Sequence, residues 1–77
     1  MKETLELILA NLVENKEDIT ILEKENGRLT EIEVKVPEKD MGRVIGKQGK
    51  TANAIRTIMK SLAGRDNKKI SIEFESK

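Results

Sequence analysis

The dipeptide Asn26-Gly27 is the feature that most constrains the fold, because it lies between two segments in which apolar and polar residues alternate. Asn-Gly is a strong signal for a two-residue hairpin turn, and an alternation with period two is typical of a strand with one buried face. The sequence therefore predicts a β-hairpin made of residues 19–25 and 28–36 around a type I′ turn. The expected cross-strand pairs are Glu25 with Arg28, Ile21 with Ile32, and Ile19 with Val34.

Three further segments have the apolar spacing of amphipathic helices, namely residues 2–14, 38–45 and 50–63. Gly64 is expected to end the last of these helices, since glycine is common just beyond a helix end. The expected apolar stripes are Leu5, Ile8, Leu9, Leu12 and Val13 in the first helix, and Ala52, Ile55, Ile58, Met59 and Leu62 in the last. Residues 69–75 alternate again and predict a third strand, with Ile70, Ile72 and Phe74 on its buried side.

The resulting order is helix, strand, strand, short helix, helix, strand, within a single domain of residues 1–77. Each strand offers only one apolar face, so the helices are expected to cover one face of the sheet. The last strand is reached through a helical crossover, which favours a parallel, right-handed connection to the second strand. The predicted fold class is α+β, a two-layer structure with a three-stranded mixed sheet.

The composition argues against an enzyme or a metalloprotein. The chain has no cysteine and no histidine, so it lacks the usual metal ligands, nucleophiles and bases, and a lone Asp40 makes no acid–base pair. No cofactor is expected. The apolar stretch from Leu5 to Val13 is interrupted by polar residues and is too short for a secretory signal or a membrane span. A soluble, cytoplasmic protein is therefore expected.

The charges are unevenly distributed along a chain whose net charge is only +1. The segment from Met41 to Gly64 contains five cations and no acid, so the rest of the chain carries a net charge of −4. The five cations are Arg43, Lys47, Lys50, Arg56 and Lys60. A basic segment on an acidic body is typical of a site for a polyanion, although a solvated cationic helix face gives the same pattern.

The centre of this basic segment is the loop Gly46-Lys47-Gln48-Gly49, between two predicted helices. Two glycines three residues apart allow a tight turn with no Cβ atom at either glycine, so a sugar–phosphate backbone can approach the main chain there. The helix that follows presents unpaired amides and the positive end of its dipole at the same place. A glycine-containing turn between two helices is also a common structural connection, so this motif alone is weak.

The longer run Gly42-Arg43-Val44-Ile45-Gly46-Lys47-Gln48-Gly49-Lys50-Thr51 resembles the signature of the K-homology (KH) family. The predicted element order resembles the prokaryotic, type II form of that fold, and the likeness extends over nearly the whole chain. Within the family, the chain is similar to the KhpA-like (YlqC-like) group of small bacterial proteins with a single KH domain. The chain departs from the family pattern at Ala52, where a larger apolar residue is usual, which puts the base preference in doubt.

The resemblance implies that the loop clamps the backbone of about four nucleotides of single-stranded RNA while the bases lie in an apolar groove. Residues 46–49 would hold the backbone, Arg43, Lys50 and Arg56 would assist by charge, and Val44, Ile45, Thr51 and Ala52 would line the groove. The RNA-binding residues expected on this basis are Arg43, Val44, Ile45, Gly46, Lys47, Gln48, Gly49, Lys50, Thr51 and Arg56.

The same resemblance implies a homodimer, or a heterodimer with a larger KH-containing protein of the KhpB (Jag) type. It also implies an RNA chaperone or post-transcriptional regulator linked to cell elongation and envelope homeostasis. Leu22 and Met41 are candidates for a dimer surface, although each is more often a plain exposed or edge residue. No membrane and no small-molecule substrate are expected.

Two other functions remain open from the sequence. One is a protein-interaction module with little RNA binding of its own. The other is DNA binding, in single-stranded form or through the outer face of helix 50–63, which carries Asn53, Arg56, Thr57 and Lys60. The only aromatic residue, Phe74, is expected in the core, which argues against a sheet-face stacking platform.

Overall fold

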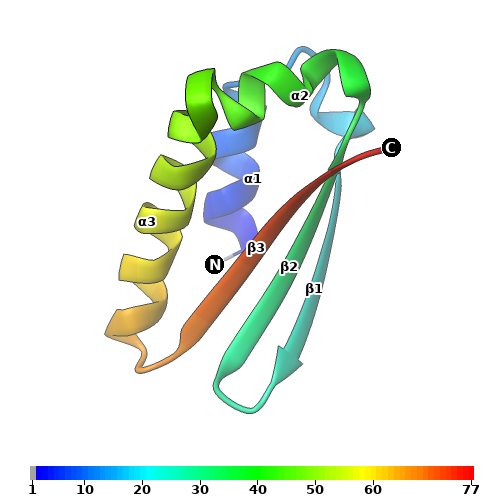
Figure 1. Ribbon diagram of the computed structural model, residues 1–77. Coiled ribbons are helices and arrows are strands. Elements are labelled where there is room, and N and C mark those ends of the chain that lie inside the picture. The colour runs from blue at the N-terminus through cyan, green and yellow to red at the C-terminus, as the bar shows by residue number, and fades with distance from the viewer. Residues whose placement is uncertain (1) are drawn as a thin grey trace.

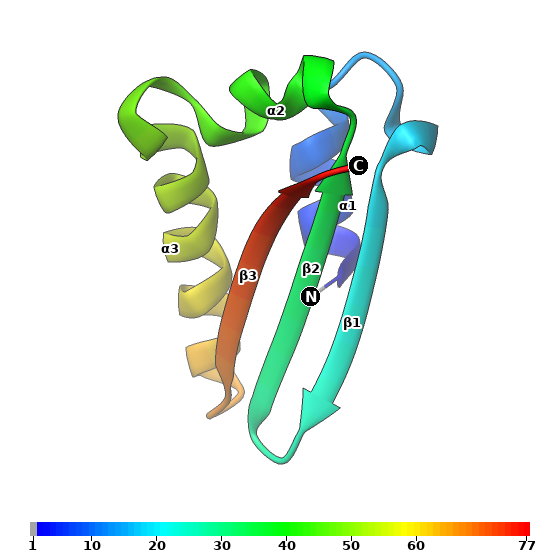
Figure 2. The ribbon, with the colours of Figure 1, turned by 45° about the vertical axis from the view of Figure 1, so that its right-hand side comes forward.

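Two helices lie on one face of a three-stranded sheet, and a shorter helix crosses the end of the sheet (Figures 1 and 2). The computed structural model describes residues 2–77. In chain order the elements are α1 (Lys2–Ala10), the 3₁₀ turn η1 (Lys16–Asp18), β1 (Thr20–Asn26), β2 (Leu29–Val36), α2 (Glu38–Ile45), the 3₁₀ turn η2 (Lys47–Gly49), α3 (Lys50–Arg65) and β3 (Lys69–Ser76). This α+β order with helices on one sheet face confirms the fold class predicted from the sequence.

The sheet has the order β1-β2-β3 and is mixed, as expected. β1 and β2 are antiparallel, while β2 and β3 are parallel because the chain crosses over through α2 and α3 between them. In the parallel pair, Ile32 lies beside Ile72 and Val34 lies beside Phe74. The inward side chains of the two strands therefore form continuous apolar rows under the helices.

The hairpin register differs from the prediction by two residues. Asn26 pairs with Leu29 and Ile21 pairs with Val34, so the turn consists of Gly27 and Arg28. Gly27 has a φ of +66° and Arg28 has no positive φ, which is the pattern of a type II′ turn and not of type I′. A shift by two leaves every side chain on the same face, because the side-chain period of a strand is two. The apolar pattern therefore defines the buried face but does not distinguish these two registers.

The core lies between the sheet and the helices. Its buried apolar residues are Leu5, Leu9, Val13, Ile32, Val34, Val36, Val44, Ala52, Ile55, Met59, Ala63, Ile70 and Ile72. The stripe expected for α3 is wrong at Ile58, which is 47% exposed, whereas Ala63 is fully buried. At 100° per residue, Ile58 lies about 100° around the helix from the centre of the buried stripe.

Both long helices end at places that differ from the prediction. α1 ends at Ala10, because the amides of Leu12 and Val13 both turn back to the carbonyl of Leu9. α3 does not stop at Gly64 and continues to Arg65. It ends where Asn67 adopts a positive φ of 57°.

The end of α3 has the hydrogen bonds of a Schellman motif. Asn67 N–H bonds to the Gly64 carbonyl at 3.0 Å, and Lys68 N–H bonds to the Ala63 carbonyl at 2.9 Å. Asparagine, which tolerates the left-handed conformation, therefore serves where glycine was expected. Within residues 2–77, none of the helices combines the length and the apolar character that a membrane span requires.

Candidate nucleic-acid interface

The loop of residues 46–49 joins α2 to α3 at the end of the molecule opposite the hairpin turn (Figures 1 and 2). Three of its four residues have positive φ, namely Gly46 at 77°, Gln48 at 58° and Gly49 at 77°. The turn is closed by a hydrogen bond of 3.2 Å from the Gly49 amide to the Gly46 carbonyl. The chain thus reverses within a few residues, and the side chains of Lys47 and Gln48 are exposed.

Gly46 is required by its backbone conformation and by its surroundings. Its φ of 77° and ψ of 175° lie in a region that is essentially restricted to glycine. A Cβ atom at this position would lie 2.8 Å from the backbone nitrogen of Thr51, closer than real Cβ contacts come. The backbone of α3 therefore packs directly against Gly46.

The surroundings of Gly49 are less crowded than those of Gly46. Its φ of 77° and ψ of 10° are left-handed helical, a conformation that asparagine and aspartate also tolerate. A Cβ atom here would meet only the Asn53 amide nitrogen, at 3.9 Å. The space beside Gly49 is thus free for another molecule.

The N-terminus of α3 lacks a side-chain cap, since its N-cap residue is Gly49. The first-turn amides of a helix have no partners within the helix, and together with the dipole they favour an anion. Lys47 and Lys50 are exposed at the same place, and neither makes an ion pair with any other residue of the described range 2–77. Two cations without ion pairs therefore lie at the positive end of the α3 dipole, while the first amide of α3, that of Lys50, bonds back to the Lys47 carbonyl.

The two arginines of the basic segment both have partners within the protein, although Arg43 is half exposed. Arg56 donates from Nε to the Ile72 carbonyl at 3.1 Å and from Nη1 to Asn53 Oδ1 at 3.3 Å. Its guanidinium also lies 5.4 Å from the centre of the Phe74 ring. Arg56 thus ties α3 to β3 and lies over the aromatic ring.

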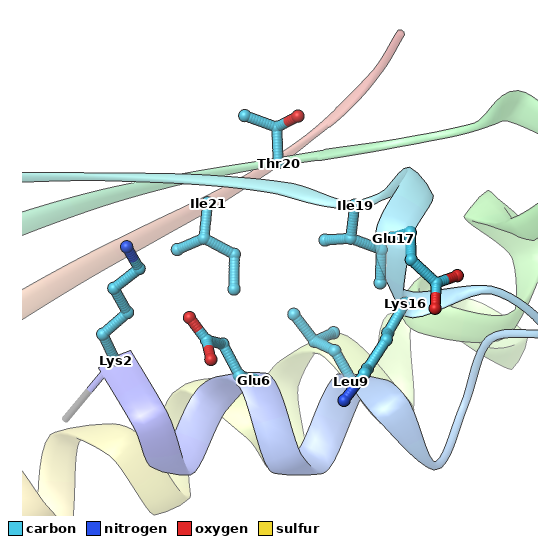
Figure 3. A pocket seen from close by; sticks show the side chains of 8 residues that line it. All are labelled: Lys2, Glu6, Leu9, Lys16, Glu17, Ile19, Thr20 and Ile21. Carbon is cyan, nitrogen blue, oxygen red and sulfur yellow. The ribbon is translucent and has the colours of Figure 1, made fainter.

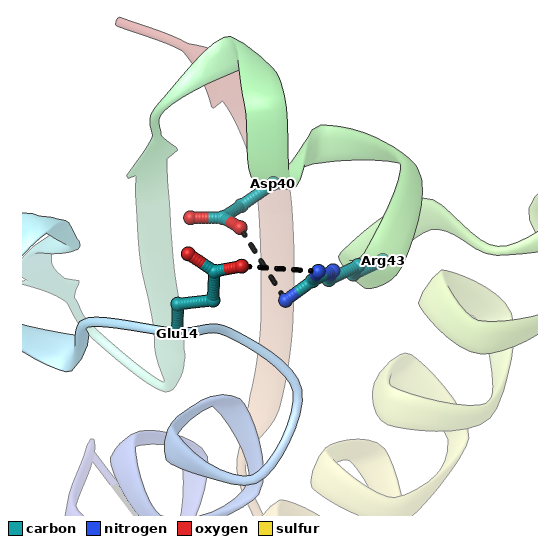
Figure 4. Close-up of polar contacts among 3 residues, drawn as sticks. All are labelled: Glu14, Asp40 and Arg43. Atoms are coloured by element: carbon teal, nitrogen blue, oxygen red, sulfur yellow. Dashed lines mark hydrogen bonds and ion pairs between the residues drawn. The ribbon is translucent and has the colours of Figure 1, made fainter.

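Arg43 lies between two carboxyl groups (Figure 4). Its Nη2 donates to Glu14 Oε1 at 3.3 Å, and its Nη1 lies 3.9 Å from Asp40 Oδ1. Sequence reasoning missed the role of Glu14, which is 29 residues away from Arg43 and belongs to the turn after α1. An Asp three residues before an Arg in one helix is a local signal for the second contact.

Two of the residues expected to line an apolar groove are core residues instead. Val44 has no exposed surface and Ala52 is 2% exposed, so neither offers an area to a base. They face the core because they lie on the inner stripes of α2 and α3, next to the sheet. Ile45 and Thr51 are half-buried and remain accessible beside the loop.

The surface clefts lie elsewhere. A cleft of about 450 Å³ between α1 and β1 is lined by Leu9, Ile19 and Ile21, with charged side chains at its rim (Figure 3). A second cleft lies over the outer face of the sheet, and a third lies beside the start of β3. Residues 46–49 line none of these three clefts.

The outer face of α3 is poorly suited to reading a DNA groove. Asn53 and Arg56 bond to each other, and the Thr57 hydroxyl donates to the Asn53 carbonyl at 2.9 Å. Of the four side chains expected there, only Lys60 makes no such contact among residues 2–77. The same residues contain no group of three or more carboxylates that could hold a metal ion.

A three-stranded mixed sheet covered by helices on one face, with a Gly-x-x-Gly turn between α2 and α3, defines this protein as a KH domain. The chain belongs to the family described as KhpA/KhpB, KH domain, whose model matches residues 2–74. The resemblance inferred from the sequence is thereby confirmed.

Curated relatives match over nearly the full chain. The chain is 45% identical to the RNA-binding protein KhpA of Clostridium perfringens over 74 residues, which cover 96% of this chain and 99% of the relative. It is 42% identical to the RNA-binding protein KhpA of Chlamydia trachomatis, with 96% and 95% covered. It is 40% identical to the RNA-binding protein KhpA of Listeria monocytogenes, with 96% and 97% covered.

Proposed function

We propose that this protein binds RNA and that it clamps a short single-stranded segment with the loop of residues 46–49. The observation that carries the proposal is the backbone of this loop, where Gly46 and Gly49 both have positive φ and a Cβ atom at Gly49 would have only one neighbour within 4 Å. A sugar–phosphate chain can approach the backbone at Gly49 without meeting a Cβ atom of that residue. The relatives named as RNA-binding proteins support the choice of RNA.

The proposed contacts follow from exposure and charge. Lys47 and Lys50 attract phosphates, and the exposed amide of Gln48 supplies further hydrogen-bond donors and acceptors. The half-buried Ile45 and Thr51 flank the loop and are the residues available to contact a ribose or a base edge. A clamp of this kind holds about four nucleotides.

The rest of the proposal concerns the biological setting. The protein acts as a non-enzymatic, cytoplasmic RNA chaperone or regulator, either as a homodimer or with a larger KH-containing partner of the KhpB (Jag) type. The link to cell elongation and envelope homeostasis rests on the family resemblance alone. Pairing is physically reasonable, since two linked weak sites raise apparent affinity by roughly 10²–10⁴.

The test is the double variant Lys47→Asp/Gln48→Asp, measured by gel shift with a short single-stranded RNA of mixed sequence. We expect binding to fall at least tenfold, because two carboxylates would face the phosphates. Gln48 has a φ of 58° and a ψ of 27°, a conformation that aspartate accepts, so the fold should be retained. Circular dichroism and thermal unfolding check this point.

The matched control is Lys24→Asp/Asn26→Asp, which makes the same change in net charge on the exposed part of β1. This control should bind RNA nearly as the wild type does. If the folded loop variant keeps its RNA affinity, the clamp is refuted and the protein-interaction module becomes the better interpretation. Parallel titrations with single-stranded DNA and duplex DNA, at one salt concentration, test the DNA-binding alternative.

A further inference from the structure

Arg43 connects two parts of the chain that the sequence keeps far apart. Glu14 lies in the turn after α1, while Asp40 and Arg43 lie on α2 (Figure 4). The guanidinium contacts Glu14 with one terminal nitrogen, at 3.3 Å, and approaches Asp40 with the other, at 3.9 Å. This three-residue cluster of Glu14, Asp40 and Arg43 therefore holds α2 against the end of α1.

Asp40 makes the cluster unusual, because its side chain is 2% exposed and its Oδ2 has no hydrogen-bond partner among residues 2–77. An acid at the third position of a helix often accepts a hydrogen bond from the N-cap amide. Here the N-cap residue is Pro37, which has no N–H. Arg43 is the one cation within ion-pair distance of Asp40 in the part of the chain that the structure describes.

Half of the Arg43 side chain is exposed, but its guanidinium is not free to leave the cluster. A guanidinium that moved to an RNA phosphate would leave the buried Asp40 carboxyl without its cation, and uncompensated buried carboxylates are strongly unfavourable. The lysines of the loop carry no such penalty, because they are exposed and make no ion pair within residues 2–77.

The cluster is nevertheless connected to the loop. Arg43 lies in the last turn of α2, and the amide of Gly46 bonds to the carbonyl of Gly42 at 2.9 Å. The position of α2 therefore determines where Gly46 begins the turn and how it meets Thr51. A shift of α2 would move the clamp as a whole.

We propose that Arg43 is a positioning residue, which fixes α2 and thereby the loop through Glu14 and Asp40, and that it does not contact RNA phosphate. The inference rests on the proposed RNA-binding function. It assigns Arg43 a role that differs from the direct electrostatic one expected from the sequence, and it adds Glu14 and Asp40 to the residues that support the site.

The experiment compares Arg43→Gln, Arg43→Lys, Glu14→Gln and the double variant Glu14→Gln/Arg43→Gln. RNA affinity is measured at several salt concentrations with the same mixed-sequence oligonucleotide. We expect Glu14→Gln to weaken binding by about 2- to 5-fold, the range that an exposed ion pair supplies. Arg43→Gln should weaken binding more, the double variant should be no weaker than Arg43→Gln, and Arg43→Lys should restore part of the loss.

The salt dependence distinguishes positioning from contact. Each lost phosphate contact on a single strand flattens the plot of log affinity against log salt by about 0.7. Lys47→Gln should show this change, whereas Arg43→Gln should leave the slope as in the wild type. A flatter slope for Arg43→Gln, or tighter binding by Glu14→Gln because Glu14 had competed with phosphate for Arg43, would overturn the inference and leave the loop clamp standing.

Amide hydrogen exchange of the free protein tests the positioning step without RNA. Arg43→Gln and Glu14→Gln should both speed exchange of the Gly46 amide, and Arg43→Lys should do so less. Unchanged exchange in Arg43→Gln would refute the positioning role. Failure of the wild type to bind RNA at all would refute the proposed function separately, and the exchange data would still decide the role of the cluster.

Discussion

At the scale of single residues, Gly46 and Gly49 are glycines for different reasons. Gly46 combines positive φ with an extended ψ, and the backbone of Thr51 occupies the place of its missing side chain. Gly49 has an ordinary left-handed conformation and faces open space. The first glycine therefore maintains the structure of the loop, and the second keeps the surface free for a ligand.

This difference predicts that a substitution at Gly46 mainly lowers stability, whereas a substitution at Gly49 mainly weakens RNA binding. Gly46→Ala should lower the free energy of unfolding by about 3 kcal/mol, because it adds backbone strain and a contact with Thr51. Gly49→Asn should cost less than about 1 kcal/mol, since asparagine accepts the left-handed region, yet it should weaken RNA binding by filling the open space. Urea denaturation and gel shift measure the two effects. Equal losses of stability would contradict the distinction.

The sequence could identify the loop but not these separate roles. The spacing of the two glycines predicts a bare turn, whereas their φ and ψ values depend on how α3 packs against α2. The contact of Arg43 with Glu14 was beyond prediction for a similar reason, since 29 residues separate the two and only the folded chain brings them together. Val44 is buried in this structure, and an apolar residue next to a binding loop gives the same sequence signal in a groove as in the core.

At the scale of elements, the periodicity of the strands predicted their faces but not every partner. Ile32, Val34 and Val36 are buried as expected, and yet the hairpin register was wrong by two residues. The expectation placed Asn26 and Gly27 at the centre of the turn. The structure places Gly27 and Arg28 there, so Asn26 belongs to β1. Turn geometry distinguishes registers that the apolar pattern leaves equivalent.

The end of α3 gives a prediction of the same kind. Gly64 lies within the helix with no positive φ, and a Cβ atom there would meet nothing within 4 Å. Gly64→Ala should therefore raise the free energy of unfolding by about 0.5–1 kcal/mol, because alanine is the better helix former. Asn67→Ala should lower it by about 1 kcal/mol, since Asn67 holds the left-handed position of the helix end. Thermal unfolding of both variants checks the signs, and a loss of stability in Gly64→Ala would contradict this structure of the helix end.

At the scale of the whole molecule, the outer face of the sheet carries charges of both signs around an acidic centre. Glu31, Glu33 and Glu73 line a shallow cleft there, together with Lys24. Glu33 and Glu73 lie directly beside each other in the parallel register, whereas Lys35 lies beside Glu75. Like charges in this position are destabilising.

The cost of placing Glu33 beside Glu73 can be measured. Glu73→Lys should raise the free energy of unfolding by about 0.5 kcal/mol at low salt, since it replaces a repulsion with an attraction to Glu33. Glu75→Lys is the matched control, because Glu75 lies beside Lys35 and the change reverses a favourable pair. This control should lower stability by a similar amount. Both effects should shrink at high salt, and equal shifts of one sign would contradict the register of β2 and β3.

The contacts that Arg43 and Arg56 make with other residues of the protein have a consequence for how a strand would move once bound. The cations left over are lysines, whose hydrated point charges fix no plane, unlike the flat fork of a guanidinium. Each nucleotide of an RNA presents the same phosphate, so contacts from these lysines bind every position along the strand with similar affinity. We expect the protein to diffuse along its RNA until a partner or a fold in the strand arrests it.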